Sequence, residues 1–196
     1  MGALHPQDMP DKTLVLIGAG SGCWPTFTTA PEYRDGRRNP LDRWSKRIIG
    51  DIAQGARTLY PSDGPPYAPF IVYALATGRF HASPTGMMVH DVAGLMISIR
   101  GAIALNGLMP LSAPQISPCE TCADQPCTMA CPVGALSTDQ AYDVPICKNY
   151  LNSLRGQTTC MTQGCAVRIA CPVSQSFDRD PAQSAFHMRA FSGAET

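Results

Sequence analysis

Four cysteines lie close together in the stretch CETCADQPCTMACP, residues 119–132. Their spacing is Cys-x2-Cys-x4-Cys-x3-Cys, and Pro132 follows the last of them. Thiolate sulfur is a soft ligand, and groups of four cysteines select zinc or iron–sulfur clusters. The stretch is therefore a candidate metal site, either complete in itself or part of a larger one.

A second group of four cysteines follows at wider spacing and also ends in a Cys-Pro pair. Its members are Cys147, Cys160, Cys165 and Cys171. Zinc ribbons and fingers typically join two short knuckles across a gap of a dozen or more residues. Three cysteines in one loop, with a fourth followed by proline, are typical of ferredoxins. The spacing therefore favours iron–sulfur clusters, with two zinc sites or free thiols as the alternative.

The order of the eight cysteines resembles that of bacterial two-cluster [4Fe–4S] ferredoxins. It is most similar to the ferredoxin-like module of epoxyqueuosine reductase and related corrinoid-linked reductases. There, a run of four cysteines is followed by one isolated cysteine and then by a second run ending in Cys-Pro. The stretches CETCADQPCTMACPVGAL, PICKNYL and CMTQGCAVRIACPV reproduce this order over roughly residues 115–178. The loops are longer here, since four residues instead of two separate Cys122 from Cys127.

The resemblance implies two [4Fe–4S] clusters with a crossed set of ligands. In the family, the last cysteine of each run binds the cluster of the other run. The implied ligands of one cluster are Cys119, Cys122, Cys127 and Cys171. The implied ligands of the other are Cys131, Cys147, Cys160 and Cys165. The opening stretch would then supply three ligands of one cluster and one of the other.

The uneven placement of the cysteines predicts two parts. Cys23 lies alone, and we expect a small thiol that is buried or half-exposed and not a ligand. The proline- and serine-containing stretch PLSAPQISP, residues 110–118, is typical of a linker. We therefore expect an N-terminal part at 1–110, a ferredoxin-like two-cluster domain at 111–178 and a C-terminal tail at 179–196.

The N-terminal part is expected to contain one strand, helices and a β-hairpin. The strand lies in KTLVLIG. One helix begins at Asn39-Pro40 and places Trp44, Ile48, Ile49, Ile52, Ala56 and Leu59 on its buried face. A second helix in PFIVYALATG ends at Gly78, and residues 87–92 and 95–105 form the hairpin.

The glycines after the first strand partly match a dinucleotide-binding loop. Cys23 replaces the third glycine of that motif, however, and Pro25 and Pro31 interrupt the helix that the motif must open. We therefore reject nucleotide binding at this position.

The cysteine-rich part is expected to be rich in loops and short helices. VPICKNYLNSLRG predicts one helix that carries Cys147, ends at Gly156, and packs inward through Ile146, Tyr150, Leu151 and Leu154. The fold class is therefore α+β, with a small N-terminal part packed on a ferredoxin-like domain.

Two polar residues of the expected hairpin are candidate cofactor-binding residues. His90 would serve as a ligand or proton donor, although a lone histidine on an apolar strand is more often a hydrogen-bonded core residue. Arg100 needs an acceptor if it is buried, because an unpaired buried charge is costly. An internal carboxylate such as Asp91 or Asp63 would serve, and so would the carboxylate or phosphate of a ligand.

The composition argues against nucleic-acid and membrane partners. Fifteen basic and fifteen acidic residues give a formal net charge of zero, and no basic stripe is visible. The most apolar stretch, residues 93–109, contains Arg100 and Asn106 and is too short for a clean membrane span. No secretory signal is evident at the N-terminus, so we expect a cytoplasmic protein.

Two functions agree with these features. The favoured one is an electron carrier with two clusters that docks on a redox partner protein. The alternative is a reductase whose N-terminal part binds a substrate or an organic cofactor, such as a corrinoid, another tetrapyrrole or a flavin. A purely structural iron–sulfur protein is least favoured, because two adjacent clusters exceed what one structural staple needs. Whether the protein is an enzyme stays open.

Overall fold

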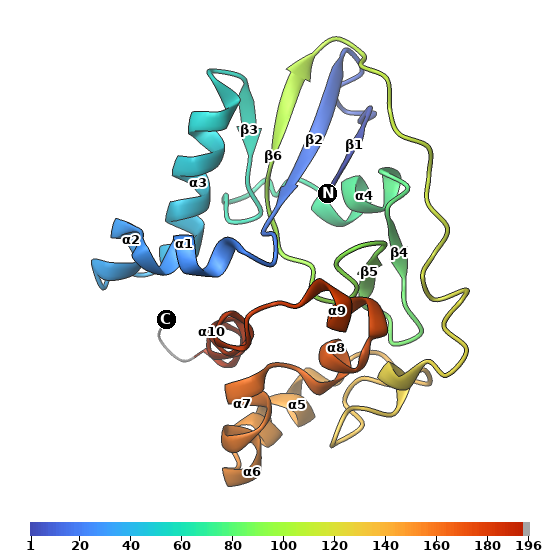
Figure 1. Ribbon diagram of the computed structural model, residues 1–196. Coiled ribbons are helices and arrows are strands. Elements are labelled where there is room, and N and C mark those ends of the chain that lie inside the picture. The colour runs from blue at the N-terminus through green and yellow to red at the C-terminus, as the bar shows by residue number, and fades with distance from the viewer. Residues whose placement is uncertain (194–196) are drawn as a thin grey trace. The chain divides into compact units, whose positions relative to one another are not determined.

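The computed structural model describes residues 1–193, which divide into two compact units (Figure 1). The first unit comprises Met1–Phe80 and Ser98–Ile116, and the second comprises His81–Ile97 and Ser117–Thr196. Helices and small antiparallel sheets occur together, which confirms the α+β class. The chain passes from one unit to the other three times, whereas the sequence predicts a single boundary at 110–118. Residues 81–97 lie in the second unit, which also contains the eight clustered cysteines.

The first unit is built on a four-stranded sheet in which every pairing is antiparallel. Its order is β1 (Gly2–Leu4), β2 (Lys12–Gly18), β6 (Ile99–Asn106) and β3 (Arg57–Leu59). The strand predicted in KTLVLIG is confirmed as β2. Its register places Leu14 opposite Ala104 and Leu16 opposite Ala102, and all four side chains are buried.

The expected hairpin of residues 87–92 and 95–105 is wrong. Its second strand is β6, which pairs with β2 and β3 in the first unit. Its first strand is β5 (Met88–His90), which pairs with β4 (Phe80–Ala82). Only a local bridge between His90 and Gly94 remains of it. Both segments contain strands, as their apolar content predicts, but apolar content does not specify which strand is the partner.

Four helices accompany the sheet of the first unit. They are α1 (Cys23–Thr29), α2 (Pro31–Arg34), α3 (Pro40–Ala53) and α4 (Phe70–Ala76). Pro25 and Pro31 were expected to prevent helices, but each lies in a first turn, where its missing N–H removes no helical hydrogen bond. The helix predicted in PFIVYALATG is confirmed as α4.

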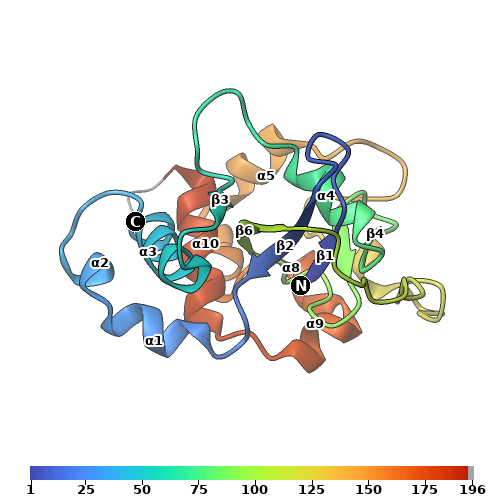
Figure 2. The ribbon, with the colours of Figure 1, turned by 90° about the horizontal axis from the view of Figure 1, so that it is seen from above.

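Helix α3 is shorter than predicted and buries a different face. It ends at Ala53 because Gln54 and Gly55 adopt positive φ angles of 47° and 89°, after which the chain enters β3. Helix α3 lies against β6 of the sheet (Figure 2). Ile49 and Ala53 of the helix pack with Ile103 of β6. Ile52, which was expected on the buried face, is 58% exposed.

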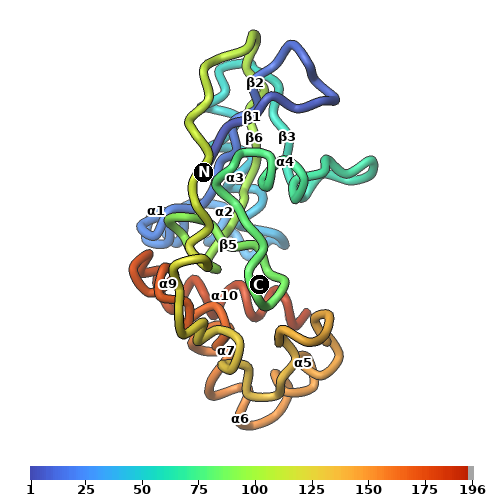
Figure 3. The backbone as a smooth tube through the Cα atoms, turned by 90° about the vertical axis from the view of Figure 1, so that its right-hand side faces the viewer, coloured from blue at the N-terminus to red at the C-terminus, as the bar shows by residue number. Residues whose placement is uncertain are grey.

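The second unit contains the β4–β5 pair and seven short helical segments. The segments are η1 (Pro126–Thr128), α5 (Val144–Leu151), α6 (Leu154–Thr158), α7 (Cys160–Gln163), α8 (Ala166–Ala170), α9 (Pro172–Phe177) and α10 (Pro181–Ser192). Figure 3 shows α5, α6 and α7 gathered at one end of this unit. Among residues 1–193, no helix combines the length and apolarity that crossing a bilayer needs.

Two predictions for this unit need correction. The single helix expected around Cys147 is divided into α5 and α6, and Gly156 lies inside α6 instead of ending a helix. A Cβ atom on Gly156 would lie 1.9 Å from the Tyr150 carbonyl oxygen, so this close turn needs glycine. Leu154 is 91% exposed and does not pack inward. The expected tail contains helix α10, which packs on α7.

Residues 81–97 are attached to the rest of the second unit through the N-terminal end of α9. Gly94, with φ of +55°, lies so close to Ser174 that an added Cβ would be 2.4 Å from the Ser174 nitrogen. The Leu95 N–H donates a hydrogen bond of 2.8 Å to Ser174 Oγ. The Arg168 guanidinium donates to the Leu95 carbonyl oxygen. These contacts fix Leu95 beside the cysteine-bearing loops.

Candidate metal centre

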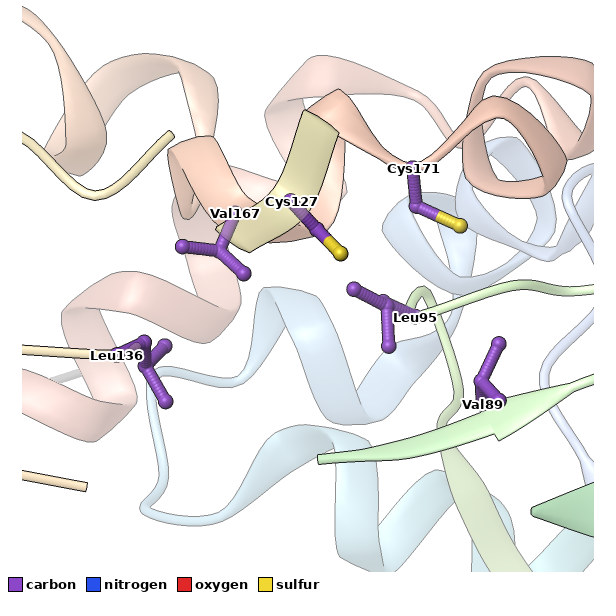
Figure 4. Close-up of a cluster of buried hydrophobic side chains, with 6 residues drawn as sticks. All are labelled: Val89, Leu95, Cys127, Leu136, Val167 and Cys171. Atoms are coloured by element: carbon purple, nitrogen blue, oxygen red, sulfur yellow. The ribbon is translucent and has the colours of Figure 1, made fainter. Parts of the chain in front are cut away.

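Four cysteines line one cavity of about 500 Å³ in the second unit. This first cysteine set consists of Cys119, Cys122, Cys127 and Cys171. Val89, Leu95 and Val173 contribute apolar wall to this first cavity. In Figure 4 the sulfur atoms of Cys127 and Cys171 lie on the side of their backbone segments that faces Leu95. The first cavity is therefore a thiol-lined space with a largely apolar wall.

Turns and helix ends hold the first cysteine set. The Cys122 N–H donates to the Cys119 carbonyl oxygen at 3.4 Å, so these two cysteines share one turn. Cys127 lies in η1. Cys171 is the C-cap of α8 and the N-cap of α9, and Pro172 fixes the first helical position after it. The proline thus turns the chain into α9 immediately after the cysteine.

The other four cysteines line a second, narrower cavity. This second cysteine set consists of Cys131, Cys147, Cys160 and Cys165. The free volume of this second cavity is about 20 Å³, and Leu136, Leu151, Val167 and Met188 belong to its wall. Among residues 1–193, no charged side chain lines this second cavity, whereas Asp124 lines the first.

Each set draws cysteines from both sequence runs. Cys127 and Cys131, which are four positions apart, line different cavities. The five-residue helix α8 has Cys165 of the second set as its N-cap and Cys171 of the first set as its C-cap. The structure therefore brings the eight cysteines together in the two groups of four that the ferredoxin resemblance implies as ligand sets.

The electrostatics of the thiols follow the same grouping. Burial raises the pKa of the Cys119 and Cys127 thiols, and the neighbouring sulfurs that raise each pKa further belong to the first set. Burial likewise raises the pKa of Cys147 and Cys160, with further contributions from Cys131 and Cys165 of the second set. Thiols with raised pKa values hold their protons at neutral pH, so a bound metal would have to displace them.

One backbone donor points at a cysteine sulfur, since the Ala135 N–H donates to Cys131 Sγ at 3.2 Å. Such a hydrogen bond stabilises negative charge on sulfur, as a metal-bound thiolate carries it. In the first set, the Cys119 backbone N–H donates to Ser117 Oγ at 3.3 Å, which fixes the chain at this cysteine.

The thiols of each set line a space instead of meeting at one point. In residues 1–193, no three His, Cys, Asp or Glu side chains converge as binding of one metal ion requires. In a [4Fe–4S] cluster each cysteine binds a different iron, so the ligand sulfurs surround a volume instead of meeting at a point. Four thiols around a space with an apolar wall meet this description, and thiolate is the ligand that such clusters require.

The two candidate residues outside the cysteine sets have internal partners. His90 is 4% exposed, and its Nδ1 accepts hydrogen bonds from the Val92 and Ala93 N–H groups, each at 3.1 Å. It stabilises the turn before Leu95 and lines neither cysteine cavity.

Arg100 lies on β6 in the first unit and binds helix α3. Its guanidinium donates to the Asp42 carboxylate and, at 3.1 Å, to Ser45 Oγ. The internal carboxylate is thus Asp42, not Asp91 or Asp63. Cys23, the first residue of α1, is half-buried in the same unit.

Sequence reasoning missed two residues that support the cysteine sets. Ser174 Oγ accepts a hydrogen bond from the Leu95 N–H. Burial raises the pKa of Cys147, and the neighbouring Tyr142 hydroxyl opposes this rise. Ser174 follows the second Cys-Pro pair by two positions, which is a weak signal for a role near the first cavity. Tyr142 precedes Cys147 by five positions, and nothing in that spacing marks it.

Comparisons with protein-family models, with curated proteins and with solved structures found no match for this chain. The functional argument therefore rests on the two cysteine sets and their surroundings.

Proposed function

We propose that this protein is an electron-transfer protein that carries two [4Fe–4S] clusters, one bound by each cysteine set. The observation that carries the proposal is the division of eight cysteines into two sets of four, each lining its own cavity. When bound, each cluster would accept and release one electron at a time.

The residues between the cavities support electron exchange between two clusters. Leu136 and Val167 line the second cavity and also pack in one apolar core with Cys127 and Cys171 of the first set. The two sets therefore share an apolar wall. This wall keeps water away from the inner faces of both sites, and limited water access is one of the factors that set cluster potentials.

The proposed electron transfer and the thiol ligands also suggest a kind of partner and a compartment. Electrons must enter and leave, so we propose a redox partner protein. We place the protein in the cytoplasm, where thiols stay reduced and available for cluster assembly.

The reductase alternative requires a binding site for a substrate or organic cofactor outside the cysteine sets. The residues chosen for that role were His90 and Arg100, and in the described part of the chain both are engaged with internal partners. They lie in different units. No observation therefore favours the reductase over the electron carrier.

The proposal is tested by purifying the full chain without oxygen and measuring its iron, acid-labile sulfide and zinc. We expect about eight iron and eight sulfide per chain, with a broad visible absorption that dithionite bleaches. Stoichiometric zinc without sulfide would contradict the proposal. Resolved flavin or corrinoid bands would favour the reductase alternative.

A further inference from the structure

We propose that the redox partner docks on the rim of the first cavity, over residues 120–129, and that the docking face of this partner is basic. This inference rests on the proposed function and deepens it, because it assigns electron exchange with the partner to the first cluster and states the charge of the partner's surface. The second cluster would then exchange electrons with the first across their shared apolar wall.

The first cavity has an exposed rim, whereas the second is enclosed by buried and half-buried side chains. Within residues 1–193, the exposed residues that line the first cavity are Thr121, Ala123, Asp124, Pro126 and Pro172. In the same described part of the chain, Pro132 is the one exposed residue among those that line the second cavity. The free volumes, about 500 Å³ and about 20 Å³, differ in the same sense. A partner can therefore approach the first cysteine set more closely than the second.

The segment 120–129 supplies most of this exposed rim. It carries Cys122 and Cys127 of the first set, so its backbone is directly bonded to two of the proposed ligands. Met129, at the end of the segment, is 88% exposed, and methionine side chains adapt readily to the surface of a partner. Electron-transfer encounters bury less than about 1,200 Å² in total, so a loop of this size can supply a substantial part of one side.

The charges at the rim are negative. The sequence from 101 to 147 contains no lysine or arginine, and Glu120 and Asp124 are both exposed in it. Asp124 lines the first cavity, and within residues 1–193 neither carboxylate is paired with a basic side chain. An oxidised [4Fe–4S] cluster with four thiolates would add about two negative charges. A basic docking face is therefore complementary to the rim, and the attraction would speed association.

Helices α5 and α6, beside the second cysteine set, carry the opposite charge. Lys148 on α5 and Arg155 on α6 are exposed, and neither helix contains an acidic residue. Leu154, which is 91% exposed, lies between them in sequence. A partner on this surface would need an acidic face. The sign of the charge that speeds docking therefore distinguishes the rim of the first cavity from the α5–α6 surface.

The test uses cytochrome c, a basic haem protein that accepts one electron, as the probe. Succinylated cytochrome c is the matched control probe, because the same haem then lies in an acidic surface. Reduced full-length protein is mixed with each probe without oxygen, and the second-order rate constant is measured between about 0.01 M and 1 M salt, where the Debye length falls from about 30 Å to about 3 Å. In parallel, a carbodiimide couples carboxyl groups to lysines of the bound cytochrome c, and mass spectrometry locates the coupled residues.

We expect cytochrome c to react faster than its succinylated form at low salt, and its rate constant to fall as salt is added. Coupling should occur at Glu120 or Asp124. The double variant Glu120→Gln/Asp124→Asn should lose this coupling and lower the low-salt rate constant by about tenfold, with unchanged iron and sulfide content. The control variant Asp139→Asn/Asp178→Asn removes two exposed carboxylates of the same unit that line neither cysteine cavity, so it should change the rate constant much less.

Three results would overturn the inference: equal rate constants for the two probes, coupling that includes neither Glu120 nor Asp124, and an equal fall in the control variant. A faster reaction with succinylated cytochrome c would also overturn it, because the partner surface would then be the basic α5–α6 surface. Absence of iron and sulfide from the wild-type protein would instead contradict the proposed function, so the two failures are distinguishable.

Discussion

The two cysteine cavities each present four thiols but differ in size and in the residues that enclose them. The first has about 500 Å³ of free volume, and residues 83–95 supply part of its wall. The second has about 20 Å³, and Met188 of α10 closes it. One cavity is thus completed by chain that precedes the cysteines, and the other by chain that follows them.

This difference shows that ligand type and ligand environment have separate origins in the sequence. The cysteines lie between 119 and 171, but Val89 and Leu95 on one side and Met188 on the other decide how much space and water surround each set. Because water access and hydrogen bonds tune cluster potentials, two sites with identical ligands are expected to behave differently.

The largest effect should come from single ligand substitutions that test the division into sets. Cys119→Ser and Cys171→Ser should damage the same cluster, although they lie in different runs, because both sulfurs line the first cavity. Cys131→Ser should damage the other cluster. Serine is a harder and poorer ligand, so we expect loss of that cluster or its conversion to a three-iron form. Iron analysis and EPR of the reduced protein measure this.

In every one of these variants the spin–spin coupling between neighbouring clusters should disappear, while the surviving signal should differ between the two sets. If Cys131→Ser matches Cys119→Ser and differs from Cys171→Ser, each run builds its own cluster, and the comparison of the two cavities fails.

A strong effect limited to the first cavity is expected from Gly94→Ala. A left-handed backbone costs alanine about 1–2 kcal/mol, and the new methyl group would also lie 2.4 Å from the Ser174 nitrogen. The shift of Leu95 should reduce the occupancy and thermal stability of the first cluster more than those of the second. Cluster-specific EPR intensity after heating provides the measurement.

Gly86→Ala is the matched control for this substitution. Gly86 has φ of +76° in the same segment, but an added Cβ would meet nothing within 4 Å. Only the backbone cost of about 1–2 kcal/mol then applies. Equal damage from both substitutions would show that backbone strain, and not the Ser174 contact, controls the first cavity.

Intact wild-type protein should also distinguish the two cavities, with a moderate effect. On slow exposure to ferricyanide or oxygen, the first cluster should be lost before the second, because its cavity is larger and admits oxidant and water more readily. EPR samples taken during exposure follow each cluster by its own signal, which the Cys119→Ser and Cys131→Ser variants assign to the first and the second cluster. Simultaneous loss, or earlier loss of the second cluster, would contradict the expected difference in access.

The smallest effect concerns the first unit and should leave both clusters unchanged. The Tyr73 hydroxyl donates to the Asp8 carboxylate at 2.6 Å, and burial together with this contact raises the pKa of Tyr73 to about 12. A raised pKa means that the folded state keeps the proton, so stability is present below about pH 10 and falls between pH 10 and 12.

Tyr73→Phe should therefore weaken this alkaline loss of stability, as measured by urea unfolding at pH 9 and pH 11. An unchanged pH dependence would contradict the role of Tyr73, and a changed cluster content would contradict the independence of the cysteine sets from this contact.

The sequence allowed the elements near strong local signals to be predicted. Alternating apolar residues located β2, and the apolar run before Gly78 located α4. The grouping of the cysteines was implied by the resemblance of their order to that of two-cluster ferredoxins. The choice of strand partner failed: β6 pairs with β2 across about ninety positions, and Met88–His90 pairs with the preceding strand β4 instead of the segment that follows it. Apolar content indicates that a strand is buried but does not identify its partner.

Other misses have equally specific causes. Arg100 was expected to need an acceptor, but its acceptor Asp42 lies on another element at a distance in sequence that no local pattern encodes. Helix α10 was expected to be a tail, because a helix of twelve residues is marginal in isolation and its packing on α7 is not encoded by a local pattern. Tyr142 lies beside Cys147 through a loop whose path the sequence does not specify.

The interleaved path of the chain between the two units has a consequence for biosynthesis. Residues 81–97 leave the ribosome before Ser117, so Val89 and Leu95 emerge before any of the cysteine-bearing loops against which they pack. Cys171, the last cysteine of the first set, and α10, which lines the second cavity through Met188, are made after most of the other residues that line the two cavities. Chains fold from the N-terminus as they emerge, at about 5–20 residues per second. The four-stranded sheet can therefore form before either cavity is complete, and the proposed clusters would enter only after the sheet has formed.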